Sequence, residues 1–100
     1  MKNMEYRLRY LPLAKQDIDE IEQYLSRFYP STVGRFFEEL QHSMRLLQDS
    51  PDMGENYRQY RRLVVQKYLV FYKVNHEECL VDIYRILRGT VDIERHVSKK

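Results

Sequence analysis

Near the start of the chain, apolar and polar residues alternate. In the segment MEYRLRYL every second residue, from Met4 to Tyr10, is apolar or aromatic, and the residues between them are charged. This period of two predicts a half-buried strand with one face toward a core. Pro12 follows closely and is expected to end it.

A helical period replaces the alternation after the strand. From Ala14 to Phe28, apolar residues recur at intervals of three or four positions, and acidic residues occupy the opposite side. This stripe predicts an amphipathic helix. Because proline is favoured in the first turn of a helix, the helix is expected to run from about Pro12 to Phe28.

A second stripe with the same spacing runs from Val33 to Leu47. Ser31 or Thr32 is available as the N-cap of this second helix, and the segment DSPDMG is expected to end it. Two equal stripes joined by a short turn predict an αα-hairpin.

The second half of the chain has the composition of strands. The segments RRLVVQ, YLVFYKV and CLVDIYRILRG are rich in Val, Ile, Leu and Tyr and are separated by short polar stretches. They predict three strands in an antiparallel meander, the last ending at Gly89. TVDIERHV predicts one short helical turn capped by Thr90.

The expected fold class is therefore α+β, with an N-terminal strand, an αα-hairpin and a three-stranded antiparallel meander packed on the helices. We expect a single domain of residues 1–100 with a short C-terminal helical tail within residues 90–100.

One choice of strand phase gives the meander an apolar inner face toward the helices and a basic, aromatic outer face. The expected inner face contains Leu63, Val65, Leu69, Phe71, Val81, Ile83 and Leu87. The expected outer face contains Arg62, Tyr68, Tyr72, Tyr84 and Arg88. Arg85 is in phase with the inner face, so we expect a structural ion pair with a helix carboxylate such as Asp17 rather than contact with a target.

The distribution of charge gives the outer face a candidate role. Residues 1–55 carry seven Lys/Arg and ten Asp/Glu, a net charge of −3, whereas residues 56–100 carry ten and five, a net charge of +5. Arg offers a planar fork for phosphate or carboxylate, and Tyr offers a stacking face. The outer face therefore suits an RNA strand or an acidic protein segment, and a solvated sheet face is the equally open alternative.

Several classes of site have no support in the sequence. The single Cys79 excludes an intrachain disulfide and a multi-cysteine zinc site, and it is typical of a small core thiol in a reducing cytoplasm. No apolar run approaches the roughly 20 residues of a membrane span, and no signal peptide is recognisable. The three histidines stand far apart and no phosphate-binding loop is present, so we expect no metal, no cofactor and no membrane partner.

Metal-free cleavage of RNA would need a base, an acid and cations around the phosphate. Candidates for the cations are Arg62 and Arg88. The candidates for proton transfer are His96, Tyr72 and Tyr84, none of which has an evident carboxylate partner in the sequence.

Taken in order, the segments YLPLAKQDIDEIEQYL, LLQDSPDMG, YRRLVVQKYLVFYKV and VDIYRILRGTVDIERHV resemble the RelE/ParE family of bacterial type II toxins, which includes plasmid stabilisation proteins. The resemblance extends from about Tyr6 to Val97. It implies a cytoplasmic toxin held inactive by a cognate antitoxin in a hetero-oligomer, with an extended, partly disordered antitoxin segment wrapped around the toxin.

The resemblance implies one of two modes of action. RelE-like members cleave messenger RNA on the ribosome, whereas ParE-like members inhibit DNA gyrase without a comparable catalytic site. Arg62 matches a basic position common to both branches. Two departures favour the ParE side: Arg88 stands where a histidine is frequent, and Val91 stands where cleaving members commonly carry a basic residue.

We therefore expect a ParE-like inhibitor of a target such as DNA gyrase. The expected target-binding residues are Arg61, Arg62, Tyr68, Tyr72, Tyr84 and Arg88. The alternative is a RelE-like, ribosome-dependent mRNA endoribonuclease with Arg62, Arg88 and Tyr84 as catalytic residues, and a third interpretation is a chain that has lost toxicity.

Overall fold

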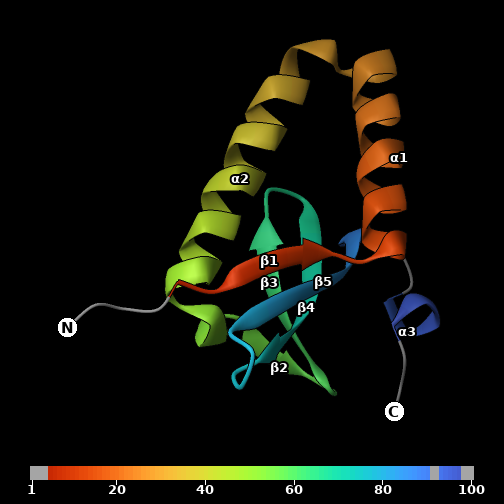
Figure 1. Ribbon diagram of the computed structural model, residues 1–100. Coiled ribbons are helices and arrows are strands. Elements are labelled where there is room, and N and C mark those ends of the chain that lie inside the picture. The colour runs from red at the N-terminus through yellow and green to blue at the C-terminus, as the bar shows by residue number, and fades with distance from the viewer. Residues whose placement is uncertain (1–4, 91–92, 98–100) are drawn as a thin grey trace.

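The computed structural model describes residues 5–90 and 93–97, and it places a helical hairpin on one face of a five-stranded sheet (Figure 1). The elements in chain order are β1 (Arg7–Tyr10), α1 (Pro12–Phe28), η1 (Pro30–Thr32), α2 (Val33–Asp49), η2 (Pro51–Met53), β2 (Glu55–Tyr57), β3 (Tyr60–Val65), β4 (Tyr68–Asn75), β5 (Leu80–Arg88) and α3 (Ile93–His96). The strand order across the sheet is β1-β5-β4-β3-β2. β1 is parallel to β5, and the other neighbours are antiparallel.

Proline sets the ends of both long helices. α1 begins at Pro12, as the sequence predicts. It ends before Tyr29-Pro30, and α2 ends before Ser50-Pro51, because the residue that precedes a proline is disfavoured in the α-helical region. Thr32 occupies the N-cap position of α2, but its hydroxyl donates to the Tyr29 carbonyl at 2.8 Å and not to the new helix.

The two helices meet at the η1 turn and diverge toward the sheet, where β1 lies between them (Figure 1). Their apolar stripes and the near face of the sheet form the inner core. Its buried members are Ala14, Ile21, Leu25, Phe36, Leu40, Met44, Leu47, Val65, Tyr68, Val70, Tyr72, Val81, Ile83 and Ile86.

Only the first half of β5 is paired with β1. The register ends where the Leu11 N–H donates to the Ile83 carbonyl at 3.0 Å, and the chain then turns into α1. Beyond that point the carboxylate of Asp17 takes the place of the missing strand. It accepts the backbone N–H of Ile86 at 2.9 Å and two hydrogen bonds from the guanidinium of Arg85 at 2.8 and 2.9 Å.

Asp17 and Arg85 form the ion pair that joins α1 to β5. Asp17 is the one buried charged residue among the described residues, with 6% of its surface exposed. The hydrogen bonds that Arg85 donates to the Asp17 carboxylate raise the pKa of Arg85 further above its ordinary value. Since an unpaired charge at this depth is costly, each partner requires the other.

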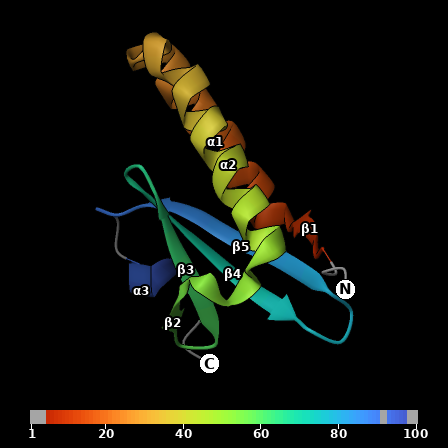
Figure 2. The same ribbon diagram turned by 90° about the vertical axis from the view of Figure 1, so that its left-hand side faces the viewer.

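The second face of the sheet is also covered. Figure 2 shows α3 on the side of the sheet opposite to α1 and α2. There Tyr60, Phe71, Leu87 and Val97 are buried together, with Tyr57, Leu69, Tyr84 and Ile93 partly buried around them. This set is called the outer core below.

The outer core corrects the expected orientation of β4. Tyr68 and Tyr72 do not lie on the outer face; they are buried under the helices, and Leu69 and Phe71 face the outer core. The prediction was wrong because β4 is covered on both sides, so its sequence carries no reliable alternation. A tyrosine with a satisfied hydroxyl is also as good a core residue as a phenylalanine.

A β-bulge corrects the expected orientation of β5. Ile83 pairs with Tyr72 and Arg85 pairs with Phe71, which leaves Tyr84 as the extra residue. The bulge reverses the phase of the strand beyond it. Leu87 consequently faces the outer core, and Arg88, opposite Tyr68, lies on the helix face instead of the predicted outer face.

The predicted fold class is confirmed, and the meander gains one strand. β2 was missed because three residues, ENY, are too short to show a period. α3 lies within the expected C-terminal helical tail. Met4 and Val91 lie outside the described residues, as does the chain that joins Thr90 to α3.

Replacing Asp17 by Asn should destabilise the fold strongly. Asn keeps an acceptor for the Ile86 N–H but leaves Arg85 without a counterion, so we expect a loss of about 3 kcal/mol. That corresponds to a fall of more than about 10 °C in melting temperature for a domain of this size.

The matched control is Asp82→Asn, which breaks the ion pair of Asp82 with Arg9 on the solvent side of the sheet. Because 58% of the Arg9 side chain is exposed, water screens this pair and the melting temperature should hardly change. Equal melting temperatures for the two variants would show that the buried Asp17–Arg85 ion pair contributes no more to stability than the exposed Arg9–Asp82 pair.

Candidate functional site

The outer face of the sheet carries a narrow row of polar and aromatic groups at the margin of the outer core, of which Lys73 is exposed, Tyr57, Arg62 and Tyr84 are half-buried and Tyr60 is buried. Tyr60 and Tyr84 stack with ring centroids 4.7 Å apart and planes 7° apart. The ammonium of Lys73 lies 5.2 Å from the Tyr60 ring, and the guanidinium of Arg62 lies 5.3 Å from the Tyr57 ring. These five residues are called the outer strip below, and two of them, Arg62 and Tyr84, belong to the basic, aromatic face expected from the sequence.

Arg62 is held in this strip by an ion pair with Glu55. Its Nε and Nη2 donate to one carboxylate oxygen of Glu55 at 3.1 and 3.0 Å, across the β2–β3 pair. Its side chain remains 36% exposed, so a partner reaches the guanidinium without unfolding anything. Burial raises the pKa of the neighbouring Tyr60, and the Tyr84 hydroxyl raises it further.

The other expected site residues are not brought to this strip. Tyr72 has no exposed surface and Tyr68 has only 5%, so neither offers a contact to a target. Arg88 lies across the sheet from Arg62, with its guanidinium 5.8 Å from the ring of Tyr24 in α1. The three residues expected for RNA cleavage, Arg62, Tyr84 and Arg88, are therefore divided between two faces.

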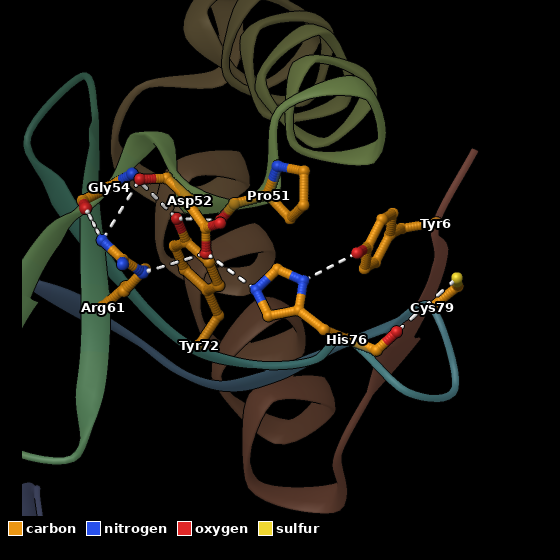
Figure 3. Close-up of polar contacts among 8 residues, drawn as sticks. All are labelled: Tyr6, Pro51, Asp52, Gly54, Arg61, Tyr72, His76 and Cys79. Carbon is orange, nitrogen blue, oxygen red and sulfur yellow. Dashed lines mark hydrogen bonds and ion pairs between the residues drawn. The ribbon is translucent and has the colours of Figure 1, made fainter. Parts of the chain in front are cut away.

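A polar cluster lies where β3 begins and β4 ends (Figure 3). The carboxylate of Asp52, in η2, contacts the guanidinium of Arg61 at 3.4 Å and the Nε2 of His76 at 3.2 Å. Arg61 also donates to the carbonyls of Asp52 and Gly54, at 3.1 and 2.8 Å. The Nδ1 of His76 lies 2.7 Å from the hydroxyl of Tyr6.

Beneath this cluster, Tyr72 fixes the η2 segment to the sheet. Its hydroxyl donates to the Pro51 carbonyl at 2.8 Å and accepts the Gly54 N–H at 2.9 Å. Burial raises the pKa of Tyr72, which keeps the hydroxyl protonated for this double role. A Cβ at position 54 would lie 2.6 Å from that hydroxyl and 2.7 Å from the carbonyl oxygen of Arg62.

The cluster borders a cavity of about 300 Å³ whose lining includes Arg58, Arg61, Lys73, His76 and a single carboxylate, Asp52. An anionic group fits this charge. His76 stands between a carboxylate and a phenol, with one ring nitrogen within hydrogen-bond distance of each. The sequence did not predict this cluster because Tyr6, Asp52 and His76 come from three separate segments, and no local pattern joins them.

The described residues offer no site for a metal ion: none of their His, Cys, Asp and Glu residues form a group of three that could hold one. Cys79 is half-buried in the turn between β4 and β5, with φ of 52° and its Sγ 3.8 Å from the His76 carbonyl. Within the described part of the chain, no helix has the length and apolar character needed to cross a membrane.

Comparison with known families identifies the class of protein. A family model described as the ParE toxin of the type II toxin–antitoxin system parDE matches residues 8–93. The chain therefore belongs to this family of toxins. A search of curated protein sequences finds no match.

Solved structures share the fold at low sequence identity. A chain of the chromosomal ParDE system of P. aeruginosa is 17% identical with a TM-score of 0.69, covering 86% of this chain and 98% of that one. A chain of the RelBE2 toxin–antitoxin complex of Mycobacterium tuberculosis is 17% identical with a TM-score of 0.62, covering 84% and 98%. A chain of the intact E. coli RelBE complex is 10% identical with a TM-score of 0.53, covering 86% and 99%.

Gly54→Ala should destabilise the protein because the new methyl group meets two fixed atoms. We expect a loss of about 1–3 kcal/mol, the usual cost of overpacking. Gly34→Ala is the matched control: nothing lies within 4 Å of its Cβ position, and alanine should stabilise α2 by about 0.5 kcal/mol. Thermal melting of both variants measures the difference, and two changes of the same sign would contradict the close packing of η2 on Tyr72.

Proposed function

We propose that this toxin acts as ParE-like toxins do, by binding a protein target, DNA gyrase, without cleaving RNA. The observation that carries the proposal is the outer core. Ile93 and Val97 pack on Phe71 and Leu87, so the middle of the sheet face opposite the helices is covered by the chain itself. An RNA strand laid along that face would first have to displace them.

The charges on the two faces support the same choice. Arg62 is paired with Glu55, and Arg88 lies on the opposite face, so these two arginines do not lie around one phosphate on the outer face. A protein target needs only an accessible patch at the edge of the covered area. The outer strip supplies the half-buried ring of Tyr84 and the guanidinium of Arg62, and Tyr and Arg are residue types enriched at protein interfaces.

A cognate antitoxin is the second proposed partner, in a toxin–antitoxin hetero-oligomer that holds the toxin inactive. Both the antitoxin and gyrase would meet the toxin in the cytoplasm. As with any ligand that binds only the folded state, the antitoxin would raise the stability of the toxin by mass action.

The second candidate function is ribosome-dependent cleavage of messenger RNA. One observation favours it, the His76–Asp52 contact beside the cations Arg61 and Lys73, which provides a base and a phosphate-binding environment outside the outer core. In that case His76 would replace the catalytic residues expected from the sequence.

Brief induction of the toxin in bacteria separates the two functions. We expect filamentation and a DNA-damage response before translation falls, together with inhibition of gyrase supercoiling by the purified toxin. Immediate arrest of translation with cut messages, abolished by His76→Ala, would instead establish the nuclease. Unchanged growth with neither response would contradict both functions.

Arg62→Ala should reduce inhibition of the target while the fold survives. The substitution removes an exposed cation and no buried apolar group, so stability should change by about 0.5 kcal/mol or less. A charge-assisted hydrogen bond of about 1.5–3 kcal/mol lost from the complex would weaken binding roughly tenfold to a hundredfold.

The inhibitory concentration in the supercoiling assay measures this loss, with the melting temperature as a check on folding. Arg45→Ala, an exposed arginine on α2 away from the outer strip, is the control and should leave inhibition unchanged. If the Arg62→Ala variant inhibits gyrase as strongly as the wild type, the outer strip is not part of the target interface.

A further inference from the structure

The end of the sheet beside η2 contains a cavity of about 300 Å³, where the start of β3 lies opposite the end of β4. Its lining comes from Asp52 in η2, from residues around the β2–β3 turn and from the last residues of β4. In Figure 3 the side chains of Arg61 and His76 point toward Asp52 from these separate segments. The volume is at the small end of the range of about 300–1,000 Å³ that ligand pockets occupy. This cavity, called the sheet-end cavity below, therefore suits a small molecule.

The lining of the sheet-end cavity has an excess of positive charge. Arg58, Arg61 and Lys73 supply three cations, against the single carboxylate of Asp52. A terminal phosphate carries a charge of about −1.5 to −2 at pH 7, whereas a phosphodiester carries one negative charge. The excess is therefore matched by a terminal phosphate and only about half matched by a phosphodiester.

Arg61 is held in place before a ligand arrives. Its Nη1 donates to the carbonyls of Asp52 and Gly54, and its Nε lies 3.4 Å from the Asp52 carboxylate. No group of the described residues accepts a hydrogen bond from its Nη2, and 30% of the side chain is exposed, so a ligand can reach this donor. A guanidinium whose plane is already fixed loses little conformational entropy when it binds an anion.

The one carboxylate of the lining is already occupied. The same oxygen of Asp52 contacts Arg61 and the Nε2 of His76, the latter at 3.2 Å. The Nδ1 of His76 in turn lies 2.7 Å from the hydroxyl of Tyr6, which holds the ring in this position. These neighbours reduce the repulsion that Asp52 exerts on an anion in the cavity.

Lys73 supplies a cation that has no carboxylate partner. The residue directly across the β4–β5 pair is Asp82, but Asp82 is bound to Arg9. In the described part of the chain no other carboxylate lies within ion-pair distance of Lys73, and its ammonium lies 5.2 Å from the Tyr60 ring. An anion in the cavity would therefore gain a charge-assisted hydrogen bond without breaking an ion pair of Lys73.

We propose that the sheet-end cavity binds a small molecule with a terminal phosphate, of the class of mononucleotides and sugar phosphates. The phosphate lies between the guanidinium of Arg61 and the ammonium of Lys73, and the amides of Asn56 and Gln59 in the lining provide neutral donors for the rest of the ligand. Such a ligand joins η2, β3 and β4, so it stabilises the folded chain by mass action. The proposal does not depend on which target the toxin inhibits.

The test is calorimetric titration of the purified chain with adenosine 5′-monophosphate at constant ionic strength. We expect saturable binding at one site, competition by inorganic phosphate, and a higher melting temperature when the ligand is present. Lys73→Gln, at an exposed position, should raise the Kd at least about tenfold, because one charge-assisted bond is lost. Lys15→Gln, an exposed lysine of α1 outside the cavity, is the control and should bind within about threefold of the wild type.

Two further ligands decide what the cavity recognises. Adenosine, which has no phosphate, should not bind, and a dinucleoside monophosphate, which has one phosphodiester and no terminal phosphate, should bind at least about tenfold more weakly than the monophosphate. Adenosine binding as tightly as the monophosphate, or equal Kd values for the Lys73→Gln and Lys15→Gln variants, would overturn the phosphate site. Equal binding of the dinucleoside monophosphate would overturn the small-molecule assignment and give the cavity to a nucleic-acid strand.

Discussion

The carboxylate of Asp17 is the contact on which the arrangement of helices and sheet depends. A sheet edge normally needs another strand, because unpaired backbone groups in an apolar setting are costly. Here β1 pairs with β5 only as far as Ile83, and the helix that follows β1 supplies the next acceptor for the β5 backbone. Hydrogen bonds to β5 therefore come from two consecutive elements. The backbone of β1 bonds the first half of β5, and the Asp17 side chain of α1 accepts the N–H of Ile86 in the second half. Arg85 balances the buried charge that this contact requires.

The same contact fixes which residues of β5 are available for function. The bulge at Tyr84 lies between the part of β5 paired with β1 and the part held by Asp17. It lets Tyr84 stack on Tyr60 outside while Arg85 reaches the helix, and it moves Arg88 to the helix face. One extra residue in β5 thus places Arg88 on the helix face, away from Arg62 and Lys73 on the outer face.

The helices, the main strands and the class of fold follow from patterns that sequence alone contains. The bounds of α1 are predictable because Pro12 and Pro30 constrain the backbone locally, and the Asp17–Arg85 contact was expected because a charge in phase with a core needs a counterion. The two faces of β4 and β5 were not predictable in the same way. A strand covered on both sides shows no alternation, and the four residues of α3 that cover the second side have no strong pattern of their own. The contacts of His76 with Tyr6 and Asp52 depend on the sheet register, which brings together the start of β1, the end of β4 and the η2 segment.

The cover of α3 on the second face of the sheet limits which ligands can bind to that face. In a two-layer α+β domain, the sheet face away from the helices is the natural surface for a long ligand, and its use depends on what the C-terminal segment does. Here Ile93 and Val97 bury the centre of that face, which leaves its margins, with the outer strip and the cluster at Asp52, open to a ligand. A ligand that had to occupy the centre would need to release α3 and expose Phe71 and Leu87 to water, at a cost of roughly 1.5–3 kcal/mol for each fully buried side chain. A protein partner that binds at a margin avoids this cost, which is the physical reason for proposing a protein target rather than a nucleic-acid strand.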